Sequence, residues 1–185
     1  QNTAKAAWSD IPRAERLGMA RALLEEAGFG PDNPLTFTYT YRSTGDNPKV
    51  APVVQANWRE IADWVQPQIQ QIDTRVHYAN LRAGDFEVGD AGWVADYNDA
   101  QNFLYLFESR TGLMNYGRFS NPEYDALVEA SNQELDMEKR AAIMAQAEQI
   151  LMDELPMIPM WFAVSKNLVN PTSPGLRTMS RTFTG

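Results

Sequence analysis

The stretch from residue 35 to residue 71 constrains the fold most, because strand and helix patterns alternate within it. Residues 35–41 alternate large apolar or aromatic side chains with threonine, which is typical of a β-strand. Residues 65–71 form a second strand pattern, in which Pro67 favours a sheet edge or a bulge. The helix pattern between them places four apolar residues on one face: Val50, Val54, Trp58 and Ile61. Strand, helix and strand in this order predict a right-handed βαβ unit with parallel strands, and hence an α/β fold.

Further helices are predicted from the residues that begin and end them. Asp10 is expected to cap a helix that Gly28 stops, with Leu17 and Leu24 facing inward. Later helices are expected to begin at three more capping residues, which are Asp73, Asn121 and Asp136. The apolar run 102–107 is expected to form a further helix, so six helices would accompany the strands.

The remaining elements are predicted from shorter patterns. The helix that follows Asp73 should bury Val76 and Leu81. A third strand is predicted over residues 86–93, and a last apolar strand over residues 157–164. The chain beyond Lys166 lacks periodicity, so we expect residues from about 171 to 185 to form a loosely ordered tail.

Composition excludes several function classes. The chain has 16 Lys+Arg and 24 Asp+Glu, a formal charge of −8, which disfavours nucleic-acid binding because phosphates require a basic surface. The absence of cysteine excludes disulfides, thiolate metal sites and thiol catalysis. His77 is the only histidine, no nucleotide-binding or hydrolase motif occurs, and the acidic residues between 85 and 99 match no catalytic or calcium pattern. The sequence therefore predicts no catalytic residue, no metal site, no cofactor and no enzyme activity.

The termini carry no targeting signal. No stretch approaches the ~20 apolar residues of a membrane-spanning helix. Residues 1–5 show no signal-peptide pattern and no initiator methionine. We therefore expect a processed product or a piece cut from a longer protein.

The segment from Gly89 to Phe103 carries the most specific pattern. A glycine-rich strand end can offer backbone N–H and C=O groups to an extended guest, Trp93 offers a flat apolar wall, and Asp96 can hold an ammonium. Together these parts would bind the N-terminus of a peptide. A purely structural interpretation stays open and is favoured by the residues alone. In it Asp99 or Asn98 caps the following helix, Asp96 forms a turn and Trp93 is core.

Five motifs in register resemble periplasmic oligopeptide-binding proteins, the solute receptors of peptide ABC importers (extracellular solute-binding proteins, family 5). Residues 92–104, GWVADYNDAQNFL, are similar to the family pattern G-W-x-A-D-Y-[ND]-[DE]-x-x-x-F-L. The other four matching segments are ALLEEAGF (22–29), GDFEV (84–88), YGRFSNPEYDAL (116–127) and AEQIL followed by PMIP (147–159). The resemblance extends from about Met19 to Val169, most of the chain.

The resemblance implies a fold, a function and a set of site residues. It implies that residues 1–185 are most of the C-terminal lobe of a two-lobed receptor, with a type II periplasmic-binding-protein fold, a mixed sheet flanked by helices. The N-terminal lobe would be missing. The receptor would be periplasmic or otherwise extracytoplasmic, and would deliver oligopeptides to the permease subunits of an ABC transporter. Asp96 would pair with the ligand ammonium, while Gly92, Trp93 and Val94 would pair with its main chain.

Departures from the family pattern leave the ligand open. Some members carry arginines where this chain has Leu81 and Asp90, so a negative Asp90 should disfavour acidic guests or shift carboxylate capture to Arg82 or to the missing lobe. A receptor for a non-peptide solute, such as a nickel chelate or haem, is the alternative within the class. A peptide hydrolase and a plain assembly module are the rivals from other classes.

Overall fold

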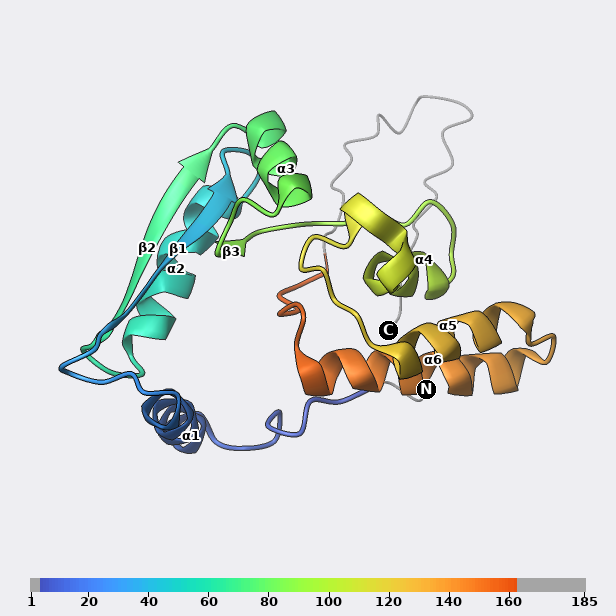
Figure 1. Cartoon of the computed structure of the whole chain (residues 1–185), viewed down its shortest axis with the longest axis horizontal. Coiled ribbons are helices and arrows are strands. Elements are labelled where there is room, and N and C mark those ends of the chain that lie inside the picture. Colours follow the sequence, from blue (N-terminus) through green and yellow to red (C-terminus); the bar gives the residue numbers. More distant parts are fainter. Residues whose placement is uncertain (1–3, 163–185) are drawn as a thin grey trace, which may run out of the picture.

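The computed structural model describes residues 4–162 and shows an α/β half and a helical half (Figure 1). The α/β half contains α1 (Arg13–Glu26), β1 (Leu35–Arg42), α2 (Asn47–Arg59), β2 (Val65–Ile72), α3 (Thr74–Ala83) and β3 (Val88–Gly89). The helical half contains α4 (Gln101–Leu104), the 3-10 turns Tyr105–Phe107 and Ser109–Met114, α5 (Pro122–Gln133) and α6 (Met137–Glu154).

The sheet has the order β2-β1-β3, and all three described strands are parallel. β1 and β2 pair from Leu35↔Val65 to Arg42↔Ile72 without a break, which confirms the predicted βαβ unit. Pro67 lies on the edge strand, as expected, and causes no bulge. The third strand is shorter than predicted, since only two of its residues pair with β1.

α2 covers one face of the sheet, where aromatic residues form the first core. Tyr39 and Tyr41 pack against Ala51, which is fully buried. Trp58 meets the rings of Phe37 and Tyr39 edge-on, at centroid distances of 5.1 and 5.6 Å. The alternate residues lie on the opposite face and are mostly threonines in β1 and glutamines in β2, with Arg42 and Ile72 at the strand ends.

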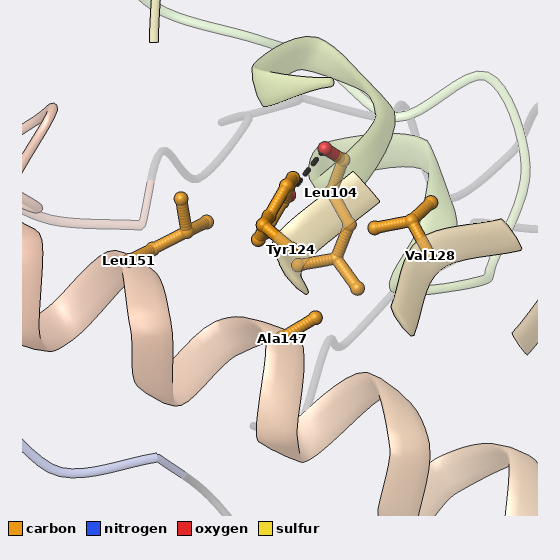
Figure 2. Packing of buried hydrophobic residues seen from close by; sticks show 5 residues of the cluster. All are labelled: Leu104, Tyr124, Val128, Ala147 and Leu151. Carbon is orange, nitrogen blue, oxygen red and sulfur yellow. Dashed lines mark hydrogen bonds between the residues drawn. The ribbon is translucent and has the colours of Figure 1, made fainter. Parts of the chain in front are cut away.

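The helical half has a core of its own between α4, α5 and α6 (Figure 2). Its buried members are Leu104, Tyr124, Val128, Ala147 and Leu151. The Tyr124 hydroxyl donates a hydrogen bond of 2.5 Å to the Leu104 carbonyl, the dashed line in Figure 2. Burial raises the pKa of Tyr124 far above its ordinary value, so the hydroxyl stays protonated and keeps donating. This hydrogen bond ties α4 to α5.

Three of the predicted helix caps are confirmed. The side chains of Asp73, Asn121 and Asp136 accept hydrogen bonds from backbone N–H groups in the first turns of α3, α5 and α6. Gly84 ends α3 with a φ of +78°, a left-handed conformation that glycine adopts at little cost.

One prediction about the first helix is wrong, and another holds only in part. Asp10 does not cap α1, because the N-cap position is Pro12 and the Asp10 carboxylate pairs with Lys5 instead. No residue of α1 is fully buried, so Leu17 and Leu24 are only partly covered.

Two further expectations differ from the structure. Val76, which was predicted to be buried, is 51% exposed. His77 is buried beside Leu81 instead. Residues four apart share a helix face, so His77 and Leu81 point inward together and Val76 turns away. Residues 157–162 form no strand, and the rest of that predicted strand lies outside the described residues, as does the expected tail at 171–185.

None of the described helices has the length and the apolar run that a membrane-spanning segment requires.

Candidate functional site

Asn102 holds together the two residues that carry the predicted binding chemistry. Its side-chain oxygen accepts one hydrogen bond from the Trp93 indole N–H, at 2.8 Å, and one from the Asp96 backbone N–H, at 3.2 Å. Asn102 is 2% exposed, because the first turn of α4 carries it inward. The sequence analysis missed this residue. Its only signal was an amide beside an otherwise apolar run.

The Asp96 carboxylate lies next to an aromatic wall. The rings of Trp93 and Tyr105 meet edge-on, with centroids 5.9 Å apart. Burial and then the negative charge of Asp96 raise the pKa of the Tyr105 phenol. Within residues 4–162 the exposed Asp96 carboxylate has no ion-pair or hydrogen-bond partner. It is therefore free to hold a cation from a guest.

The neighbouring Asp99 has a structural role instead. Its carboxylate accepts two hydrogen bonds from Arg140 on α6, at 2.6 and 3.0 Å, and one from the Gln101 backbone N–H at 2.8 Å. Burial opposes the charge, but these hydrogen bonds and the Arg140 charge hold the pKa of Asp99 below its ordinary value. The structural interpretation thus applies in part to Asp99, whose side chain holds the first residue of α4, although the N-cap position itself is Ala100.

The backbone that leads to Asp96 is the next part of the candidate site. Among the described residues, the N–H and C=O groups of Gly92, Trp93 and Val94 make no hydrogen bond. Val94 is 84% exposed and Gly92 is exposed, whereas Ala95 is buried. This segment directly follows β3 and its hydrogen bond from Asp90 N–H to the Thr40 carbonyl. It therefore presents unpaired main-chain donors and acceptors beside a sheet, as a peptide-binding strand end must.

Arg82 is exposed in the last turn of α3 and is not joined to Asp96 or Trp93 by any described contact. Its carbonyl accepts a hydrogen bond of 2.5 Å from Arg118. Burial raises the pKa of Tyr116, and the positive charge of Arg82 partly opposes that rise. The contact of Arg82 with a ligand therefore stays a prediction.

Asp90 does not present a free negative charge. Its carboxylate accepts hydrogen bonds from the backbone N–H and from Nε of Arg42, both at 2.9 Å, and its side chain is 8% exposed. The expectation that Asp90 repels acidic guests assumed an unpaired carboxylate. Because Asp90 is paired with Arg42, that assumption does not hold.

Two surface hollows border other residues of the α/β half. One of about 590 Å³ borders Pro34, Glu60 and Trp64, and one of about 520 Å³ borders Thr40 and Glu87. The described residues contain no group of three or more histidine or acidic side chains that could hold a metal ion. None of the residues from 92 to 96 lines either hollow.

The fold has a parallel sheet in the order β2-β1-β3 that is flanked by helices. This arrangement and the similar solved structures identify the class of the chain, which is a lobe of the type II periplasmic-binding-protein fold. The comparison with families makes the assignment specific. Residues 2–115 match the model of the bacterial extracellular solute-binding proteins, family 5 (middle part). The chain belongs to this family.

Individual relatives are similar over nearly the whole chain. The chain is 34% identical over 170 residues to the periplasmic oligopeptide-binding protein OppA of Haemophilus influenzae, which covers 91% of this chain and 31% of that protein. It is 33% identical over 162 residues to the "probable deoxycholate-binding periplasmic protein YgiS" of Escherichia coli, which covers 86% and 30%. The crystal structure of H. influenzae OppA in complex with the peptide RPPGFSPFR superposes with a TM-score of 0.77 at 34% identity, which covers 82% and 29%. The chain thus spans just under a third of the length of these relatives.

Proposed function

We propose that this chain is the C-terminal lobe of a longer, two-lobed receptor that binds oligopeptides for an ABC importer. The lobe would form one wall of a cleft, and a second lobe would close over the guest about a hinge. The receptor would act outside the cytoplasm, in the periplasm, and would pass its ligand to permease subunits. It would bind its solute without catalysis.

The free backbone of Gly92, Trp93 and Val94 is the observation that carries the proposal. Unpaired N–H and C=O groups beside a sheet suit an extended peptide, because every peptide offers the same main-chain groups. The unpaired Asp96 carboxylate lies at the end of this segment, where it would hold the α-ammonium of the guest. The Trp93–Tyr105 wall would cover one side of the first guest residue.

A non-peptide solute is the second candidate. The relative whose name specifies deoxycholate shows that the ligand varies among similar proteins. An apolar ring system would pack on the Trp93–Tyr105 wall without needing the Asp96 charge. The two candidates therefore differ in whether Asp96 matters.

Calorimetry on the full-length protein tests the proposal with tri- to pentapeptides, free and N-acetylated. We expect binding that acetylation abolishes. The Asp96→Asn variant should lose about 2–5 kcal/mol of binding free energy for free-amine peptides, the usual loss when one partner of a desolvated charge pair is removed. The matched control is Asp32→Asn, an exposed aspartate in the turn before β1.

The outcomes separate the candidates. A change of less than about fivefold in Asp96→Asn, roughly 1 kcal/mol, would remove Asp96 from the site. Binding that survives acetylation would keep the cleft but discard the ammonium anchor. Binding of deoxycholate but of no peptide would favour the second candidate. The isolated lobe should bind peptides weakly or not at all, since it supplies one wall only.

A further inference from the structure

A mostly buried ion pair between Arg42 and Asp90 lies next to the backbone of Gly92. Besides its two bonds to Asp90, Arg42 donates from Nη1 to the Tyr78 hydroxyl at 2.8 Å, and its guanidinium stacks over the Tyr78 ring at 5.4 Å. The Arg42 side chain is 21% exposed. The pair is thus fixed on several sides.

His77 completes the support from α3. Its Nε2 lies 2.6 Å from the Asp90 carbonyl oxygen and 3.0 Å from the Asp90 carboxylate. Both neighbours are acceptors, so Nε2 carries a proton and donates to Asp90. His77 is fully buried and Asp90 nearly so. The carboxylate therefore has a fixed position relative to the sheet.

The arginine head group reaches the surface of the binding segment at Gly92. A Cβ placed on Gly92 would stand 3.4 Å from Nη2 and 3.8 Å from Nη1 of Arg42. A guest strand that pairs with this backbone would lie about 4.8 Å beyond it, the ordinary spacing between strands. A guest side chain at that point would therefore come within reach of one positive charge, and of the negative charge paired with it.

We propose that the Arg42–Asp90 pair is a specificity determinant that cancels charge beneath Gly92, so that the receptor accepts peptides irrespective of the charge of the side chain lying there. This inference rests on the proposed peptide-binding function and deepens it, because it states which guest side chains the site tolerates. A single unpaired arginine at this position would select acidic guests, and a single unpaired aspartate would select basic ones. Pairing them allows neither preference.

The test uses the full-length protein and free-amine tetrapeptides: tetraalanine and its variants with one glutamate or one lysine at the second or third position. Calorimetry gives the ratio of affinities for the glutamate and lysine peptides at each position. In the wild type both ratios should lie within about threefold of one, as expected where charges cancel. Asp90→Asn keeps one oxygen for the Arg42 backbone N–H and removes the negative charge. It should shift the ratio at one position toward glutamate by about fivefold or more, and high salt should reduce the shift.

Arg42→Gln should shift the ratio at the same position toward lysine, and the double variant should restore the wild-type ratio. Arg59→Gln and Asp32→Asn change net charge equally at exposed sites and should leave the ratios unchanged, which controls for long-range effects. Should Arg42→Gln fail to fold, Asp90→Asn alone decides. Ratios that stay constant in Asp90→Asn would overturn the inference while tetraalanine binding upholds the proposed function. A wild-type protein that binds no tetrapeptide would overturn both.

Discussion

Removing the Asn102 carboxamide tests whether one side chain sets the geometry of the candidate site. Asn102→Leu keeps a similar volume and deletes the oxygen that accepts from the Trp93 indole and the Asp96 N–H. Each partly buried donor left unpaired costs about 1–3 kcal/mol, and some regain water, so we expect a loss of about 2–4 kcal/mol of local stability. The free energy of opening should fall most around residues 93–102.

Hydrogen exchange followed by mass spectrometry measures this loss directly, because the Asp96 N–H is protected by the bond that the variant removes. Asn98→Leu is the matched control, since Asn98 is exposed in the same turn. A double-mutant cycle with Trp93→Phe, which deletes only the indole donor and some ring area, should give a coupling energy of about 1 kcal/mol. Coupling near zero, or equal exchange in the Asn102 and Asn98 variants, would refute the reasoning.

Three further predictions concern stability. Gly89→Ala should lower the free energy of unfolding in urea by about 1–3 kcal/mol, because the new Cβ would stand 2.6 Å from the buried Leu81 side chain. In the control Gly84→Ala the new Cβ meets no atom, and only backbone strain of about 1 kcal/mol is expected. Equal losses in the two variants would contradict this. Asp99→Asn should lower stability, because it removes a carboxylate whose pKa is lowered in the folded state. The wild type holds this stability above about pH 3.8 and loses it as the pH falls through the folded pKa of Asp99. The unfolding curves of the two proteins should therefore converge in acid, and a gap that persists there would disprove the charge effect. Tyr124→Phe should lower the midpoint of thermal unfolding by the equivalent of about 1–2 kcal/mol, since it leaves a buried carbonyl without its donor; an unchanged midpoint would show that water replaces the hydroxyl.

Local rules allowed much of the fold to be predicted from the sequence. Asp73, Asn121 and Asp136 cap helices because a short acceptor side chain can reach the N–H groups two and three residues ahead, whatever surrounds it. The alternation of residues 35–41 likewise fixed which side chains of β1 face α2. These features depend on neighbours within a few positions.

The features that could not be predicted join distant residues. Arg42 and Asp90 are 48 positions apart, and only the parallel pairing of β1 with β3 brings them together. The double role of Asn102 depends on how the turn before α4 folds back toward Trp93. Asp96 was identified through a family resemblance, because the residues alone favoured a structural role for its segment.

The separation of the two cores has a consequence for the order of the cleft wall. Residues 90–100 connect the sheet-side core around Ala51 with the helical core around Tyr124, and they are anchored to one through Asp90 and to the other through Asp99 and Asn102. A segment held by two packing units loses its conformation when either unit opens. The preorganisation of Asp96 is therefore limited by the less stable of the two cores. A substitution deep in the helical half would raise the entropic cost of binding without touching the ligand.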